Sequence, residues 1–568
     1  MSAPVPAKAP FRSTLLVSPM LAAWCLALTT PPMAALAQTV PPGAGAILHQ
    51  TVQPTPPLAA PGEVLTLPEP TEQESKATLR IPVSHLTIAG NTLIPVETLH
   101  GLVQQAEGQT LTLQALRQFV NRITEAYRNQ GYPVAYAYLP AQKIHEGAIR
   151  IEVVEPRYDQ IETPGTSRLR PEVATATIGV RPGEMIETAP LERGLLLLNQ
   201  TPGVQVNGTL IAGSRSGTST LRLERQDQPP LTGSVTTDNY GNRYTGTYLT
   251  NATVAANNPF GYGSAMAFNG MISDTGGLKS DGFTLTSPNI WDGLRAGVYG
   301  SQSFYKLGSP FSSLVQVGRA TQLGGDLSYP LILRPGRLLN IRLDVLQNWL
   351  GQSTKSVGTD ARQSILIERL SLEGAFADNW QGTTTGSVAL SHGDLARNGS
   401  SVGAAAANTP KSFEMMQLGI GRNQELPHGF VLGANLTSQL SSGNLDSSQQ
   451  FFLGGPYGVM SYQTGDAGGD EGYLLRTELS HALPVPSLPG TLMGSLQVQN
   501  GTLWVHHSLF QGATGPERVT LNGVGVGLSY RWKHLNVDVA YIRRVGANGA
   551  PGYSSHADAL WCQVGLSL

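Results

Sequence analysis

Side chains able to bind a metal gather in the last quarter of this 568-residue chain. Asp466, Asp470 and Glu471 lie in a glycine-rich stretch, and His506 and His507 stand side by side farther along. Adjacent residues of an extended segment point to opposite faces, so these two histidines do not share one ion. The sequence therefore predicts no metal site.

Catalysis by a nucleophile requires a base held next to it, and the spacing of the serines, histidines and acids gives no such pair. Glycines spaced as in a dinucleotide loop occur in LNGVGVGLSY (521–530), but no helical pattern follows them. A net charge of −2 gives no electrostatic case for nucleic acid. We expect neither an enzyme nor a cofactor.

A loop near residues 454–472 separates two runs of alternating apolar and polar residues. Gly454 and Gly455 precede a proline, which ends the first strand because proline donates no ladder hydrogen bond. The loop then carries three apolar side chains, Val459, Met460 and Tyr462. A fully solvated loop has little need of these groups, so we expect the loop to fold inward.

This stretch resembles the lid loop of the two-partner secretion transporters, outer-membrane proteins that export haemolysins and filamentous adhesins. In that family a Leu-Gly-Gly step leads to a Val-Arg-Gly-Tyr tetrad. The tetrad stands here as Val459-Met460-Ser461-Tyr462. In the family, the tetrad arginine pairs with an aspartate on the inner barrel wall, in a Phe-x-Asp-x-Gly stretch.

The wall stretch corresponds here to residues 504–508, which puts His506 in place of the aspartate and Met460 in place of the arginine. Losing only one partner leaves a buried charge unpaired and destabilises the protein by about 3–5 kcal/mol, whereas replacing both partners avoids that penalty. We expect Met460 to pack near His506 as an uncharged latch.

The N-terminus has the pattern of a secretory signal, with Lys8 and Arg12 before an apolar run and an Ala-Leu-Ala site before Gln38. We expect residues 1–37 to be removed and residues 38–76, rich in proline, to be a linker or plug segment. Residues 45–53 are the part of that segment where a short helix is compatible with the prolines. The mature chain keeps one cysteine, Cys562, and forms no internal disulfide.

Residues 77–155 read as one β-α-α-β-β unit. The patterns predict a strand over 83–89, helices over 95–105 and 112–130, and strands over 135–140 and 147–154. The phrases LTIAGN, AYRNQGY and YLPAQKIHEGAIRIEVVE resemble the first polypeptide-transport-associated (POTRA) domain of the transporter family.

Residues 156–226 repeat this plan with weaker helices. We expect a strand over 158–161, helices over 170–178 and 188–199, and a hairpin of 204–211 with 218–224. The phrase LERGLLLLNQTPGVQVNGTLIAGSRSGTSTLRLE resembles the family's second POTRA domain.

Residues 230–568 alternate with period two. Val524, Val526 and Leu528 share one face of a strand, and Gly525 and Gly527 share the other. A soluble β-sandwich alternates too, but the signal peptide, the long tract of strands without a disulfide and a final strand that ends on an apolar residue favour a membrane barrel. No run of about 18 apolar residues follows the signal, so any membrane-spanning part is expected to be a barrel. At roughly 20 residues per strand and turn, with strands of about 9–11 residues, the tract gives about sixteen strands.

The start of this tract also resembles the family's barrel. Asp238, Asn239 and Gly241 belong to its opening phrase, and YPLILRPGR follows farther on. The resemblance implies α+β POTRA domains in the periplasm of a Gram-negative bacterium, followed by an antiparallel transmembrane β-barrel. It also implies a monomer in outer-membrane lipid.

The function implied is export of an unfolded secretory partner with an N-terminal secretion domain. The POTRA domains capture the partner and the barrel lumen passes it outward. Two alternatives stay open: a factor that inserts other barrels into the outer membrane, and a passive pore or adhesin.

Overall fold

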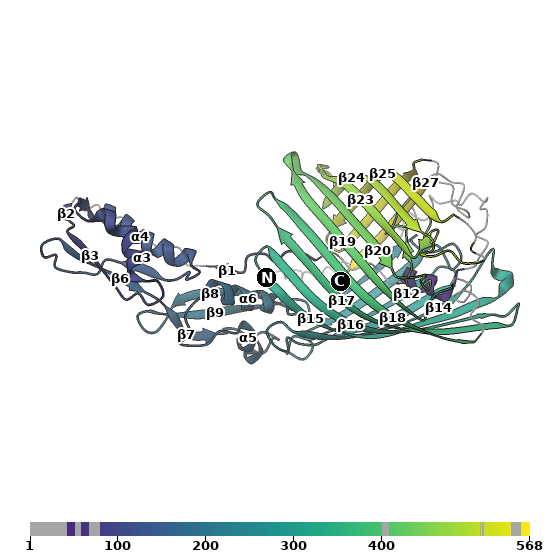
Figure 1. Cartoon of the computed structure of the whole chain (residues 1–568), viewed down its shortest axis with the longest axis horizontal. Coiled ribbons are helices and arrows are strands. Elements are labelled where there is room, and N and C mark those ends of the chain that lie inside the picture. Colours follow the sequence, from purple (N-terminus) through teal and green to yellow (C-terminus); the bar gives the residue numbers. More distant parts are fainter. Residues whose placement is uncertain are drawn as a thin grey trace, which may run out of the picture.

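Two α+β domains and a large barrel follow one another along the long axis of the molecule (Figure 1). The computed structural model describes residues 42–51, 58–66, 80–399, 408–511, 513, 516–546 and 558–568. The predicted secretory signal and much of the predicted linker lie outside these residues. None of the helices within them is long and apolar enough to cross a membrane.

The first domain packs two helices on a three-stranded sheet of order β3-β6-β5, in which β3 is parallel to β6. Thr112 caps the longer helix by accepting a hydrogen bond from Ala115 N, and one apolar stripe of this helix enters the core. The short β2–β4 pair was not predicted. The elements are β2 (Arg80–Pro82), β3 (His85–Ala89), α3 (Val96–Val103), η1 (Gln104–Ala106), β4 (Thr110–Thr112), α4 (Leu113–Asn129), β5 (Tyr136–Tyr138) and β6 (Ala148–Val154).

The second domain has a four-stranded sheet of order β1-β8-β9-β7. One of its two edge strands, β1, comes from far upstream: Leu65 and Thr66 pair in parallel with Gly208 and Thr209. The predicted strand, helices and hairpin of this domain are confirmed. Its elements are β1 (Leu65–Thr66), β7 (Arg157–Glu162), α5 (Pro171–Ile178), α6 (Thr188–Asn199), β8 (Val204–Ala212) and β9 (Thr218–Asp227).

The remaining chain closes a barrel of sixteen antiparallel strands, which confirms the predicted fold class. The first strand pairs with the last, Ser234 opposite Ser567. The strands are β10 (Leu231–Asp238), β11 (Leu249–Asn257), β12 (Ala265–Ser273), β13 (Leu278–Thr286), β14 (Arg295–Lys306), β15 (Gln316–Arg334), β16 (Arg337–Thr354), β17 (Thr359–Ala377), β18 (Gly382–Gly399), β19 (Ser412–Leu426), β20 (Phe430–Ser441), β23 (Glu471–Leu483), β24 (Thr491–Trp504), β25 (Arg518–Trp532), β26 (Leu535–Arg544) and β27 (Asp558–Ser567).

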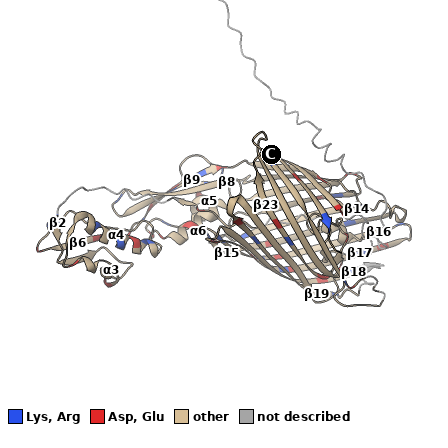
Figure 2. Ribbon diagram, turned by 90° about the horizontal axis from the view of Figure 1, so that it is seen from above, with Lys and Arg blue, Asp and Glu red and all other residues tan. Residues whose placement is uncertain are grey.

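Alternation along the strands gives the barrel an apolar outside. Val524, Val526 and Leu528 share one face of β25, as predicted, and they are about half exposed on the outside of the barrel. Charged residues are sparse along the barrel strands (Figure 2). Strands β15 to β17 have 18 or 19 residues, more than the 9–11 expected. These ladders stay paired along their whole length, so they extend beyond what is needed to span a bilayer.

The second domain docks on one end of the barrel, here called the proximal end. Arg193 on α6 forms an ion pair with Asp292 between β13 and β14, Nε to Oδ1 3.0 Å. Leu197, also on α6, packs with Leu333 and Leu338, which flank the turn between β15 and β16. Because β10 starts at this end, the loop between β20 and β23 emerges at the opposite, distal end.

A short helix, α2 (Ala44–Thr51), lies inside the barrel (Figure 1). Ile47 and Leu48 are buried among apolar side chains of the inner wall. Ala44 N donates to Gln352 Oε1 of β16 at 3.3 Å, and Ser303 Oγ of β14 donates to Thr51 Oγ1 at 3.3 Å. A short helix, which the sequence left open, is thus present here and occupies the lumen.

Candidate functional site

The loop between β20 and β23 forms a tight fold inside the barrel. Its ends pair as β21 (Phe451–Phe452) and β22 (Gly468–Gly469). Gly455 has a φ of +104° and donates its N–H to Tyr462 O at 3.0 Å. A Cβ on Gly458 would lie 1.9 Å from Leu453 O. These glycines are therefore required by the backbone path.

The inward fold of the loop agrees with the sequence prediction. Val459 and Tyr462 are buried in an apolar cluster with Leu453 and with inner-wall side chains of three neighbouring barrel strands. The wall members are Leu474 of β23, Leu503 of β24, and Val519 and Leu521 of β25. The guanidinium of Arg544 lies 4.1 Å from the ring centroid of Tyr462, a cation–π contact.

Met460 is fixed by contacts to three different strands. Its N–H donates to Gln499 Oε1 of β24 at 2.6 Å, and Trp561 Nε1 of β27 donates to its carbonyl at 2.6 Å. Its sulfur accepts from Arg476 Nη2 of β23 at 3.7 Å. Next to it, Ser461 Oγ donates to Asn522 O of β25 at 3.0 Å. Met460 and Ser461 are therefore held against the part of the wall that runs from β23 to β27.

The predicted packing of Met460 near His506 is not what the structure has. Gln499 contacts Met460, and Trp504, the last residue of the same strand, lies five residues beyond it, about 16 Å at 3.3 Å per residue. His506 follows Trp504 in the distal loop, with its ring 4.9 Å from that of Phe510. The short family motif on which the alignment rested placed the wall partner too far along the strand.

The opening phrase of the barrel closes the seam between the first and last strands. Asn239 donates through Nδ2 to Leu560 O and accepts at Oδ1 from Cys562 N, both at 2.8 Å. Asp238 is buried and accepts from Tyr240 N at 3.0 Å. A Cβ on Gly241 would lie 2.2 Å from Gly246 O, so the turn after β10 requires glycine there.

This seam also holds the lid loop. Thr464 Oγ1 donates to Tyr240 O at 2.8 Å, and Asn242 Nδ2 donates to Thr464 O at 2.9 Å. Arg243 Nη2 lies 3.6 Å from Asp466 Oδ1, and the Asp466 side chain is only 3% exposed. This ion pair was not predicted. The only sign of it in the sequence is an arginine two residues after the opening phrase, together with an aspartate in the lid.

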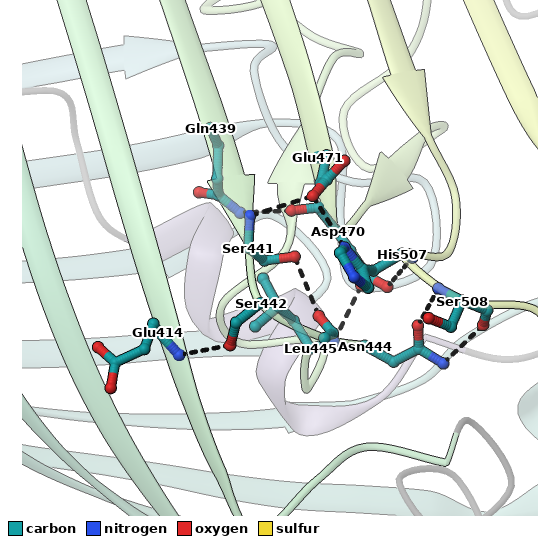
Figure 3. A network of polar contacts seen from close by, with 11 residues as sticks. Glu414, Gln439, Ser441, Ser442, Asn444, Leu445, Asp470, Glu471, His507 and Ser508 are labelled. Atoms are coloured by element: carbon teal, nitrogen blue, oxygen red, sulfur yellow. Dashed lines mark hydrogen bonds and ion pairs between the residues drawn. The ribbon is translucent and has the colours of Figure 1, made fainter.

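A polar network fixes the base of the lid to the neighbouring distal loop (Figure 3). Asp470 is fully buried and accepts hydrogen bonds from Leu445 N at 3.1 Å and His507 N at 2.9 Å. Asn444 and Ser508 exchange two hydrogen bonds, and His507 Nδ1 lies 2.9 Å from Glu471 Oε1. The acids considered as metal ligands thus serve in hydrogen bonds that order the loop.

A closed barrel that holds a loop and a helix in its lumen, preceded by two α+β domains, defines a polypeptide-transporting barrel of the outer membrane. Comparison with known proteins narrows this class. The family model of the ShlB-type POTRA domain matches residues 81–156. That of the haemolysin secretion/activation protein ShlB/FhaC/HecB matches residues 217–285 and 377–530.

The chain belongs to this family of two-partner secretion transporters, with its POTRA domains in the periplasm and its barrel in the outer membrane. The heme/hemopexin transporter protein HuxB of Haemophilus influenzae (strain 86-028NP) is 29% identical over 469 residues, 81% of this chain and 83% of that one. The outer membrane transporter CdiB of Dickeya dadantii (strain 3937) is 24% identical over 447 residues, 76% of this chain and 77% of the relative.

Solved structures share the fold. CdiB from Escherichia coli superposes with a TM-score of 0.69 at 19% identity, over 88% of this chain and 93% of that chain. BamA from Haemophilus ducreyi lacking POTRA domains 1–3 gives a TM-score of 0.51 at 12% identity, over 86% of this chain and all of that one. The proximal end of the barrel therefore faces the periplasm, and the distal end faces the cell surface.

Proposed function

We propose that this transporter exports one secreted partner protein, which enters unfolded from the periplasm and leaves through the barrel lumen. The observation that carries the proposal is the path of the chain's own N-terminal segment. Leu65 and Thr66 lie in the sheet of the second POTRA domain, Pro61 O accepts from Gly336 N at the periplasmic mouth, and α2 lies in the lumen. A polypeptide thus fits along the route that a client would take.

Capture takes place by strand addition in this proposal. In the first POTRA domain, the edge strands β3 and β5 each donate a backbone hydrogen bond to a side chain. Leu86 N donates to Glu107, and Ala137 N donates to Thr124. The edge of β8 carries only the two-residue strand β1. A client segment that is longer than β1 gains more backbone hydrogen bonds at this edge, so it displaces β1.

The proposal also covers the oligomeric state of the transporter and what drives export. Each of the sixteen barrel strands exposes a large apolar side chain, such as Phe268, Leu390 or Leu496. An apolar surface around the whole wall supports a monomer surrounded by outer-membrane lipid.

Export in this scheme uses no cofactor and no enzymatic step, because folding of the client outside the cell biases its movement outward.

The two alternative functions, a passive pore and an assembly factor for other barrels, fit these observations less well. A passive pore requires an open bore, whereas α2 and the lid loop both pack against the inner wall here. An assembly factor for other barrels shares the fold, as the likeness to BamA illustrates, but the matched family model is that of secretion proteins.

The experiment that tests the proposal is deletion of the gene, followed by an inventory of secreted and outer-membrane proteins. We expect one large exoprotein to disappear from the medium, with the other outer-membrane barrels at normal abundance. A general loss of outer-membrane barrels would instead support the assembly factor, and an unchanged secretome would contradict export.

A further inference from the structure

Two histidines and a glutamate meet at one edge of the first POTRA domain. His85 begins β3, His100 lies on α3, and Glu107 follows η1. His85 Nδ1 and His100 Nε2 each lie 3.2 Å from Glu107 Oε1. Within the described residues, these three side chains form the group whose ligand atoms all lie within 4.8 Å of one another.

These separations suit a tetrahedral ion. Zinc binds imidazole nitrogen and carboxylate oxygen at about 2.0–2.2 Å, so neighbouring ligand atoms of a tetrahedral site are roughly 3.3–3.5 Å apart. The two measured separations of 3.2 Å to Glu107 Oε1 are close to that edge length. The ligand atoms of the two imidazoles also lie within 4.8 Å of each other.

The surroundings also suit an ion from solvent. The side chains of His85, His100 and Glu107 are 66%, 33% and 24% exposed, so an ion reaches them and a water completes the coordination. Glu107 is positioned by Leu86 N, which donates to its Oε1 at 2.7 Å, the kind of outer contact that orients a metal-binding carboxylate.

We propose that His85, His100 and Glu107 form a zinc-class divalent metal site on the first POTRA domain. Two imidazoles and one carboxylate are a donor set that suits zinc, with a water in the fourth position. The ion links the edge strand β3 to α3 and to the segment after η1. This edge lies opposite β5 in the sheet and belongs to a different domain from β8, so metal binding and client capture use separate surfaces.

The test uses the full-length protein in detergent, without a histidine tag and stripped with a chelator. Zinc is titrated in competition with a chromophoric chelator, and cobalt serves as a spectroscopic probe of tetrahedral geometry. The variants are His100→Ala and Glu107→Gln. Glutamine still accepts from Leu86 N but lacks the negative charge. His145→Ala is the matched control, because His145 is an exposed histidine of the same domain outside the cluster.

We expect the wild type to bind one zinc ion per chain, and we expect the control to bind it equally well. In both variants the affinity for zinc should be at least about tenfold weaker, because even replacing a residue that only orients a ligand lowers metal affinity about 10–100-fold. Melting curves in the presence of chelator establish that each variant is folded. Saturable binding that survives equally in Glu107→Gln and His100→Ala would overturn the proposal, and so would the absence of saturable binding by the wild type. Neither outcome bears on export, which the secretome experiment tests separately.

Discussion

At the scale of residues, the lid keeps its attachment to the wall although its charges are arranged differently from the family pattern. The tetrad has Met460 in place of arginine, and the positive charge that reaches it comes from Arg476 on the wall. The negative charge lies on the lid instead, at Asp466, where it pairs with Arg243. Sequence comparison identified the missing arginine, but only the fold brings these two arginines to the lid.

Restoring arginine at position 460 is therefore expected to harm the protein. Met460→Arg places a second guanidinium beside Arg476, and two like charges 4 Å apart cost about 4 kcal/mol at an effective dielectric constant of about 20. Adding Gln499→Glu supplies a carboxylate at the atom that already accepts from Met460 N, so secretion should recover.

Secretion of the client, normalised to the amount of barrel in the outer membrane, measures this effect. The matched control is Met460→Arg with His506→Asp, which we expect to remain defective because His506 lies in the distal loop. Rescue by His506→Asp, with none by Gln499→Glu, would show that the family's wall position is in use after all.

Glu155 makes the first POTRA domain sensitive to acid. Burial alone raises the pKa of this carboxyl, but hydrogen bonds from the Thr92 and Tyr127 hydroxyls and from the Thr92 and Leu93 amides outweigh it, so the pKa lies below its usual 4.5. Because this pKa is lower in the folded domain than in the unfolded chain, the ionised carboxylate of Glu155 stabilises the fold above pH 4.5. This stability is lost as the pH falls through the pKa that Glu155 has in the folded domain.

We expect Glu155→Gln to cost the domain about 1–2 kcal/mol at neutral pH, because a charged acceptor is lost. Hydrogen exchange of α4, corrected for intrinsic rates, should be faster in this variant at pH 7 and should match the wild type well below pH 4. Glu125→Gln, an exposed position on the same helix, serves as the control. A difference that persists unchanged at low pH would refute the role of the carboxylate.

At the scale of elements, the parts predicted best are those with a strong local period. Helix α4 buries Leu116, Val120, Ile123 and Tyr127, and its bounds lie within a residue of those expected. Among the elements missed are β1, β2 and β4, which have two or three residues each. Such segments carry no periodicity, and they become strands only because a partner far away in sequence pairs with them.

Strand β1 leads to a prediction about client binding. If β1 occupies the capture edge of β8, the combined variant Leu65→Gly with Thr66→Gly frees that edge and raises the binding-competent fraction, so the apparent affinity for a client increases. We expect the dissociation constant for the client's secretion domain to fall about three- to tenfold.

Biolayer interferometry with the full-length transporter measures this constant, and Thr110→Gly in β4 controls for general loosening of a short strand. Weaker binding by the double glycine variant would mean that β1 is part of the docking surface rather than its competitor.

At the scale of the whole molecule, the barrel was predictable because alternation over many strands is a cumulative signal. The contents of the lumen were harder to derive. A helix of eight residues has no preferred place until a wall of matching shape exists. Residues distant in sequence, such as Ile47, Tyr305 and Leu445, meet there only after the barrel closes.

The position of α2 predicts that it limits the conductance of the barrel. Ile47 and Leu48 are 1% and 3% exposed against the inner wall, so Ile47→Asp with Leu48→Asp buries two carboxylates without partners and expels the helix. We expect recordings in planar bilayers to show long open events in this variant and short ones in the wild type. Thr51→Ala removes the hydrogen bonds of the Thr51 hydroxyl with Ser303 and Leu48 but leaves Ile47 and Leu48 in place, so it should behave as the wild type. Unchanged conductance of the double variant would mean that the lid loop, held by Asp466 and the tetrad, closes the lumen without help from α2.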